Sequence, residues 1–439
     1  MIVVPLFLIG LFVVYSFIDT RKAILIAVLI RPVIDCFWSE KYSVVGIKPT
    51  ELLGFILPTL IFIKIVMSHE QSFTRAPLSL LWIVYIYFQL FGTVLIMSVG
   101  ESPILAVDYF YRAFNGFIGF YLFQVFFRTR VEFRALLIAH IVAGIFPLGV
   151  SVYQNVLGGT IRSEATIAGL MRNIGFYHDA YTLRLYCFQT LAAVLLYWCY
   201  FLPGYRTAAR GFLLLMAAIA TLSVYKLYSK AGYLVIAEWL LVWYAAQKKF
   251  LQLGMIVFFL AVAGFLMRGT LTTLDKVYSN EVGVMEGKEG ADRMFAGRVG
   301  AWRRALEDYP RKPVALQLVG DGSPHTGAHN DFLRALLGTG VIGLLFYCAL
   351  LGTVGTRTVL NCLREQSPLN IMAVMLIGMW LVDAMGLVPG AYPGYQIFVW
   401  GFIGLALRGV EGLTVPGSLA KGTGIDVPGI VMPEEPVRC

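Results

Sequence analysis

The sequence is poor in charged residues. Only 14% of its 439 residues are Asp, Glu, Lys or Arg, whereas about 25% is usual in a soluble globular domain. At the same time 58% are hydrophobic, and they form many separate runs of about 18 to 22 residues, long enough to cross a bilayer as helices. The composition therefore excludes a soluble domain and predicts a polytopic membrane protein.

Cysteine is scarce, and its spacing matches no binding pattern. The 6 cysteines are scattered, mostly inside apolar runs, and no two form a Cys-x-x-Cys pair. This spacing predicts neither a disulfide framework nor a metal cluster. Basic residues interleaved with aromatic ones, which a nucleic-acid groove needs for stacking, are also missing. We therefore expect no nucleic-acid partner, and we attribute the net charge of +9 to loops that anchor the protein at the bilayer.

The apolar runs predict an all-α polytopic integral membrane protein with about 12 to 13 transmembrane helices. Residues 1–18 are too long and too uniformly apolar for the core of a cleaved signal peptide, so they are expected to form the first helix. The predicted helices cover residues 2–18, 23–38, 50–67, 78–97, 104–127, 135–157, 181–201, 211–226, 231–246, 250–267, 333–355, 369–389 and 395–408.

Lys and Arg gather in alternate short loops, and this pattern predicts the orientation of the protein. The 158–180 loop, Lys230, the 268–332 loop and the N-terminus are then expected outside, which is the periplasm for the inner membrane of a Gram-negative cell. The loops expected on the cytoplasmic side contain Arg21, Lys22, Arg75, Arg128, Arg130, Arg134, Arg206, Arg210, Lys248, Lys249, Arg357 and Arg364.

This orientation divides the chain into four parts. Residues 1–267 are predicted to form an N-terminal bundle of about 10 helices, and residues 333–408 the C-terminal helices. Residues 268–332 are predicted to form one long periplasmic loop with short amphipathic helices. Residues 409–439 are rich in Gly and Pro and show no periodicity, so a disordered cytoplasmic tail without a catalytic role is expected.

A basic, water-facing segment starts within the long loop and runs from Arg293 to Leu336. A chain that is hydrophobic nearly throughout has little reason to carry such a segment unless it performs chemistry there. Residues 296–308 are predicted to form a short amphipathic helix that is stopped by Pro310. A simpler explanation is a helix lying on the membrane, with Trp302 inward and arginines reaching lipid phosphates. The basic side chains are Arg293, Arg298, Arg303, Arg304, Arg311, Lys312, His325 and His329.

The order of residues in this segment resembles the O-antigen ligase and O-antigen polymerase (Wzy-type) family. The resemblance covers about 50 residues. It consists of Arg298 and Trp302 four residues apart, the Gly320-x-Gly322 pair, and His329-Asn330-x-Phe332-Leu333 at the start of an apolar helix. It implies a GT-C-like fold and a metal-independent, inverting glycosyltransferase without a cofactor. The donor would be an undecaprenyl-diphosphate-linked oligosaccharide in the bilayer.

The resemblance also implies roles for particular residues. Arg298 and His329 are the predicted catalytic residues, and Asn330 is a predicted diphosphate ligand. From the residues themselves, Asn330 or Asp331 is expected to cap the helix that begins near Phe332, whose N-terminus would face the diphosphate. Lys230 stands where family members commonly have Arg after Ser, so it keeps the charge but loses the two-point contact. Arg172 and Arg293 are further predicted diphosphate ligands. The alternatives are an ordinary helix cap with a solvent-facing His329, and a basic face that only anchors the loop.

Two further patterns indicate structure better than function. Gly338-x-Gly340-x-x-Gly343 matches a dinucleotide fingerprint, but no strand precedes it, so close packing within a membrane helix is expected. His325 and His329 have the spacing of two zinc ligands on a helix. Gly327 and the absence of a Glu between the histidines favour a loop without metal.

The residues suit transfer of a glycan from a polyprenyl diphosphate to a sugar hydroxyl. We expect a polymerase that joins O-antigen or exopolysaccharide repeat units, and Lys230 and the apparent helix number favour it modestly over a ligase that acts on lipid A-core. A flippase or transporter is the alternative from another class, but the matching half-repeats typical of one are missing. Pathway partners would be a chain-length regulator and a flippase.

Overall fold

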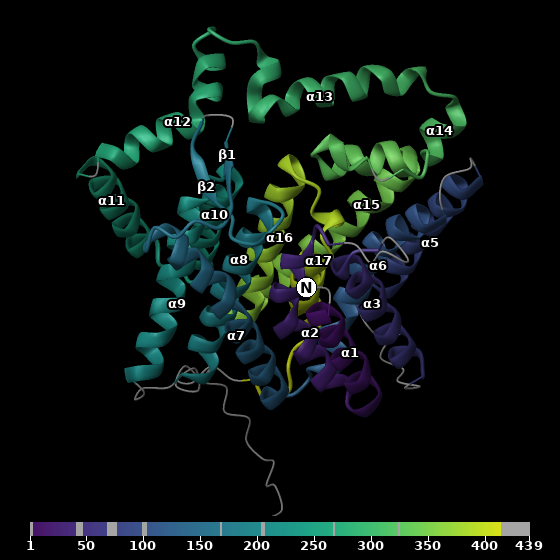
Figure 1. Ribbon diagram of the computed structural model, residues 1–439, viewed down its shortest axis with the longest axis horizontal. Helices are drawn as coiled ribbons and strands as arrows, with labels where there is room; N and C mark the ends of the chain where they lie inside the picture. Colours follow the sequence, from purple (N-terminus) through teal and green to yellow (C-terminus); the bar gives the residue numbers. More distant parts are fainter. Residues whose placement is uncertain are drawn as a thin grey trace, which may run out of the picture.

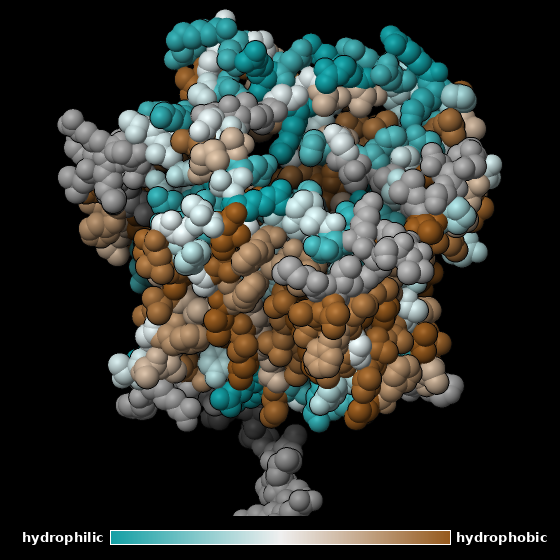
Figure 2. All heavy atoms as spheres, in the orientation of Figure 1, coloured by the Kyte–Doolittle hydropathy of each residue, from teal (hydrophilic) through white to brown (hydrophobic). Residues whose placement is uncertain are grey.

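The computed structural model describes residues 3–40, 47–67, 77–98, 103–166, 169–202, 207–266, 268–323 and 325–413. Within these ranges, 7 helices are at least 18 residues long and apolar enough to cross a membrane. On the face shown in Figure 2, apolar residues form a broad band, and hydrophilic ones gather above and below it. These features confirm the prediction of an all-α polytopic membrane protein.

Every predicted apolar range corresponds to a helix. Several of these helices are shorter than 18 residues, so the full number of spans stays a prediction. Their bounds are α1 (Val3–Ile18), α2 (Thr20–Ile34), α3 (Pro49–Met67), α5 (Ser79–Ser98), α6 (Pro103–Phe126), α7 (Arg130–Asn155), α8 (Ala180–Phe201), α9 (Thr207–Lys226), α10 (Lys230–Ala246), α11 (Phe250–Leu266), α15 (Asp331–Arg364), α16 (Pro368–Gly386) and α17 (Pro393–Arg408).

One end of the bundle gathers segments that the sequence places in the cytoplasm. The backbone N–H of Arg130 donates to the carbonyl oxygen of Glu411 at 3.1 Å. Arg21, in the first turn of α2, forms an ion pair with Glu132 in the first turn of α7. Glu132 also completes a capping box with Thr129, which explains why α7 begins there. The described part of the tail therefore lies beside the basic loops.

The opposite end gathers the segments predicted to face the periplasm. Trp38 packs edge-to-face on His178, with the ring centroids 4.5 Å apart. The Tyr392 hydroxyl donates to Asp179 Oδ2 at 2.9 Å. A short hairpin of β1 (Ser163–Ala165) and β2 (Met171–Asn173) stands at this end (Figure 1). Its strands are too short for the sequence pattern to predict. The long loop after α11 begins with a further helix, α12 (Arg268–Met285).

The membrane orientation is a prediction that labelling can test. In a protein whose native cysteines have been replaced, a cysteine at Lys288 should react with an impermeant maleimide in intact cells. A cysteine at Glu365 should react only after permeabilisation. Both side chains are exposed, so access is decided by the membrane alone. The reverse labelling pattern would invert the orientation and place the candidate site in the cytoplasm.

The long loop is mostly helical. After α12 it forms α13 (Met294–Asp308) and then α14 (Val314–Val319). α13 lies across the end of the bundle that is predicted to face the periplasm, which is called the outer end below (Figure 1). The helix predicted over 296–308 and its stop at Pro310 are confirmed, because α13 passes into a 3-10 turn at Tyr309–Arg311. The long helix α12 was not predicted as such, since residues 268–332 were expected to form a loop with only short amphipathic helices.

The helix predicted to begin near Phe332 is interrupted at Gly340. Its backbone there has φ 67° and ψ −173°, so α15 consists of two helical pieces. The loop at Gly320–Gly322 packs against this break, and the Gly322 N–H donates to the Gly338 carbonyl at 2.9 Å. A Cβ on Gly340 would lie 2.2 Å from the Leu318 carbonyl oxygen. The expected close packing is present, but the partners are the end of α14 and the glycine loop that follows it, and the helix is not continuous.

Candidate active site

Arg298 lies over the outer end of α16. A Cβ on Gly386, the last residue of that helix, would come within 3.1 Å of Arg298 Nη1. The chain enters α13 through Phe295 and Gly297, which both have positive φ, and Arg298 follows directly. Its side chain is partly buried and forms no ion pair or hydrogen bond with any residue that the structure describes. Arg298 is thus a cation without a partner among the described residues.

Two more arginines lie near Arg298. Its pKa is lowered by partial burial and by the positive charges of Arg184 and Arg172. Arg184 is paired with Asp383, and Arg172 Nη2 lies 2.9 Å from Glu164 Oε1 across the hairpin. Each neighbour therefore has its own carboxylate, whereas Arg298 has none in the part of the chain that the structure describes. An anion that binds beside Arg298 would relieve this repulsion, and phosphate oxygens suit the two-point contact that a guanidinium offers.

His329 and Asn330 lie beside the same cation. The Asn330 side chain accepts a hydrogen bond from the Leu333 N–H at 2.9 Å, so the predicted cap of α15 is confirmed. The exposed His329 has φ 48°, an uncommon conformation for a residue other than glycine. Its pKa is lowered by partial burial and by the charge of Arg298. The Trp302 indole N–H donates to the Ala328 carbonyl at 2.8 Å, which ties α13 to the His329 segment.

His325 has a different environment from His329. Its Nε2 lies 2.8 Å from Asp321 Oδ1, and Lys312 Nζ lies 2.9 Å from the other oxygen of the same carboxylate. Burial raises the pKa of Asp321, but the contacts with His325 and Lys312 outweigh it and lower the pKa to about 2. His325 therefore orders the glycine-rich loop before α15.

Two predicted diphosphate ligands are paired elsewhere. Lys230 forms an ion pair with Glu281 of α12, and its Nζ lies 5.6 Å from the Tyr278 ring centroid. Arg293 is exposed and lies 3.6 Å from Glu289. Within the described ranges neither contacts Arg298. Of the predicted residues, the structure brings together Arg298, His329, Asn330 and Arg172.

The sequence did not indicate Arg184 as part of this site. Arg184 is buried in the first turns of α8, where it pairs with Asp383 and donates from Nη1 to the Ser229 hydroxyl at 2.9 Å. Ser229 directly precedes Lys230, so this bond places Arg184 beside the residue that the resemblance had assigned to the diphosphate. The sequence carried one signal for this pair: Arg184 and Asp383 are charged residues inside two of the predicted apolar helices, where an unpaired charge is costly. A single sequence does not show which of them pair.

Asp179 and Tyr392 complete the surroundings of Arg298. Asp179 caps α8 by accepting the Thr182 N–H at 2.8 Å. Burial raises the pKa of this carboxyl, but hydrogen bonds from His178, Thr182 and Tyr392 lower it to about 2. Tyr392, which donates one of them, lies near Arg298. Asp179 is therefore anionic at neutral pH and orients the tyrosine.

Lys230 and Glu281 are expected to position Arg298. Glu281 pairs with Lys230 through Oε2 and accepts the Phe295 N–H through Oε1 at 3.1 Å, three residues before Arg298. Glu281→Ala and Lys230→Ala should each lower turnover about 10- to 100-fold, because a displaced reacting group costs about that much. The double variant should be no worse than either single variant, since both break the same link.

A second ion pair on the same loop serves as the control for Lys230 and Glu281. Lys288 and Glu286 form an exposed ion pair with Nζ and Oε2 2.6 Å apart, and Glu286→Ala should leave turnover unchanged. Turnover of purified protein with lipid-linked substrate is the measurement. If the losses at Lys230 and Glu281 multiply, Lys230 contacts the substrate independently and the positioning role is wrong.

No protein-family model matches the sequence, and no curated protein matches it either. Among solved structures, the chain is similar to one from a study of the structural coordination of polymerization and crosslinking by a peptidoglycan synthase complex. The TM-score is 0.41 at 19% identity, and the match covers 74% of this chain and 96% of that one. The function has therefore to be inferred from the residues of this protein.

Proposed function

We propose that the protein is a membrane glycosyltransferase that moves a glycan from a polyprenyl diphosphate to a sugar hydroxyl on the outer face of the membrane. The observation that supports this most is the unpaired, partly buried Arg298 beside Arg172 and Arg184. A cluster of this kind suits a ligand with more than one negative charge at the end of a lipid. His329 stands next to it with its pKa lowered, as a base requires.

The reaction needs one bond to form and one to break. The acceptor hydroxyl oxygen attacks the anomeric carbon, and the bond from that carbon to the diphosphate oxygen breaks with its electron pair. The hydroxyl proton passes to the His329 ring, and the polyprenyl diphosphate leaves with the added charge. Arg298 stabilises that charge as it grows, which is where a preorganised cation accelerates a reaction. Attack opposite the leaving group inverts the anomeric centre.

Within this class we propose a polymerase of O-antigen or exopolysaccharide repeat units. The ligase that transfers the finished glycan to lipid A-core is the second candidate. Both use the same donor and the same cation. They differ in the acceptor, which is another lipid-linked unit for the polymerase and the lipid A-core sugar for the ligase.

Deleting the gene should distinguish the two candidates. A polymerase deletion should leave surface glycan with a single repeat unit, or no high-mass exopolysaccharide, because no unit can be extended. A ligase deletion should instead accumulate full-length chains on the carrier lipid. The measurement is a polysaccharide gel together with analysis of extracted carrier lipid, and the control is the deletion strain carrying the gene on a plasmid. Long lipid-linked polymer in the deletion strain would refute the polymerase.

A further inference from the structure

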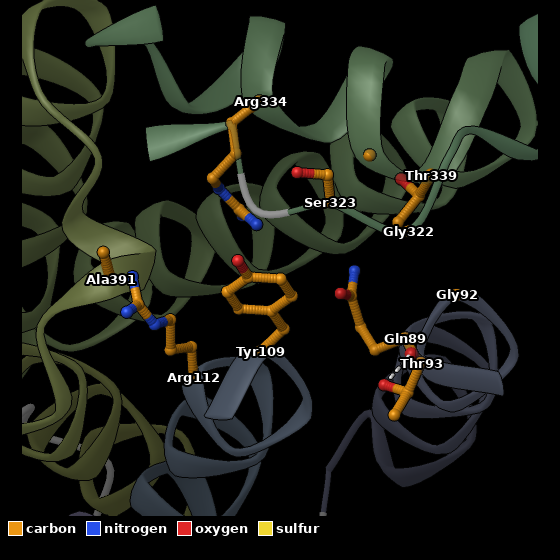
Figure 3. A pocket seen from close by; sticks show the side chains of 11 residues that line it. Gln89, Gly92, Thr93, Tyr109, Arg112, Gly322, Ser323, Arg334, Thr339 and Ala391 are labelled. Atoms are coloured by element: carbon orange, nitrogen blue, oxygen red, sulfur yellow. Dashed lines mark hydrogen bonds between the residues drawn. The ribbon is translucent and has the colours of Figure 1, made fainter. Parts of the chain in front are cut away.

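A second polar cavity lies at the outer end of the bundle, between α5, α6, the loop before α15 and α15 itself. Gln89, Tyr109, Arg112, Ser323 and Arg334 converge on it from these four segments (Figure 3). The space around these groups, counting the part that is open to solvent, is about 450 Å³. The candidate active site described above uses none of these residues.

The two arginines of this cavity are neutralised, unlike Arg298. Arg112 Nη2 lies 2.6 Å from Asp108 Oδ2, and Arg334 Nε lies 2.7 Å from Asp331 Oδ1. Two cations are thus balanced by two carboxylates, so the cavity offers hydrogen bonds without a surplus charge. A diphosphate gains little from such a site, whereas an uncharged polar ligand suits it.

Other polar groups of the cavity lack a partner of their own. Among the residues that the structure describes, no side chain or backbone group bonds the Gln89 amide, although Gln89 belongs to the apolar helix α5. The Ser323 hydroxyl is likewise without one, since only its backbone N–H is bonded, to Asp321. Both side chains point into the cavity (Figure 3). A lipid chain would leave these groups unsatisfied, while sugar hydroxyls donate and accept.

The cavity lies close to the candidate active site. A Cβ on Gly390 would be 3.1 Å from Arg334 Nη2, and a Cβ on Gly386 would be the same distance from Arg298 Nη1. These two glycines are four residues apart, so at most about 14 Å of chain separates them. The connection from α16 to α17 therefore runs between the diphosphate cluster and the neutral cavity, which is a distance that a glycan can span.

We propose that this cavity binds an uncharged sugar residue of the glycan substrate. The inference rests on the proposed function, which supplies the glycan. Gln89 and Ser323 recognise sugar hydroxyls, and Arg112 and Arg334 donate further hydrogen bonds while their carboxylates keep the site neutral. The enzyme thus divides recognition between a cationic site for the carrier and a neutral site for the sugar.

Two probes separate this site from the diphosphate site. The first is the glycan released by mild acid from a carrier-lipid extract of the native cells, which has neither lipid nor diphosphate. The second is farnesyl diphosphate, which has no sugar. Binding of each to purified protein in lipid nanodiscs is measured by saturation-transfer NMR and by titration. Gln89→Met and Ser323→Ala should each weaken glycan binding about three- to tenfold, the cost of one neutral hydrogen bond, and leave farnesyl diphosphate unaffected.

Arg298→Ala should weaken binding of farnesyl diphosphate and leave binding of the released glycan unchanged. Gln252→Met makes the same exchange as Gln89→Met at an exposed site on α11, and it should change neither affinity. Wild-type protein that binds no released glycan would overturn the proposal, as would unchanged affinity in both cavity variants. If farnesyl diphosphate fails to bind while the glycan binds and responds to the cavity variants, the sugar site stands and the proposed carrier-lipid chemistry fails.

Discussion

Replacing Arg298 by alanine should lower glycan transfer about a thousandfold or more, the effect of removing a guanidinium that stabilises a departing phosphate group. No other residue in the described part of the chain compensates, because Arg184 and Arg172 are held by Asp383 and Glu164. Arg298→Lys should recover only part of the activity, since a point charge replaces a two-point contact. Purified protein with lipid-linked donor provides the measurement, and membrane insertion should be unchanged.

The control for this variant lies on the same helix. Arg304 is exposed on α13, so Arg304→Ala should keep most of the activity while removing the same charge. If both variants lose activity equally, the basic residues act as a diffuse surface and Arg298 has no specific role. Donor binding should also fall in Arg298→Ala, because the diphosphate is already charged before the bond breaks.

The helices were predictable because burial in a bilayer imposes long apolar runs. α3 and α16 begin within one residue of their predicted starts, and the prolines at their first positions explain the sharp boundary. The break in α15 at Gly340 was not predictable in the same way. The end of α14 at Leu318 packs against this break, and hydropathy does not register a contact of this kind.

The site was predictable only where its residues are neighbours in the sequence. Arg298, Trp302, His329 and Asn330 belong to one segment, and the structure brings them together through the bond from Trp302 to Ala328. Lys230 was assigned to the same cluster by position in the resemblance. Its partner Glu281 is 51 residues away, so composition gave no sign that the charge is already neutralised.

Arg184 shows the same limit more sharply. Its partner Asp383 is 199 residues away and lies in a different helix. Each is costly alone in an apolar run, and the pair removes that cost by mutual neutralisation. The sequence therefore shows which charged residues lie inside apolar runs. Only the fold shows which of them are paired with each other and which remain available for a ligand.

His329→Ala should lower the rate of transfer about 10²- to 10⁴-fold, the range for loss of a general base, with donor lipid still bound. The acceptor hydroxyl would then have no base in contact with it. His325→Ala should cost less than about tenfold, because that ring faces Asp321 and orders a loop. Turnover of the purified variants with lipid-linked substrate provides the comparison.

The pH profile gives a sharper test of the base. Only neutral imidazole accepts a proton, so activity should fall as the pH drops through the pKa of His329. Burial and Arg298 lower that pKa below 6.5, and the acid limb of the wild type should therefore lie below pH 6.5. Arg298→Gln removes the nearby charge and should move the limb to higher pH in its residual activity. If EDTA inactivates the wild type and both histidine variants are equally inactive, the histidines hold a metal and the base assignment is wrong.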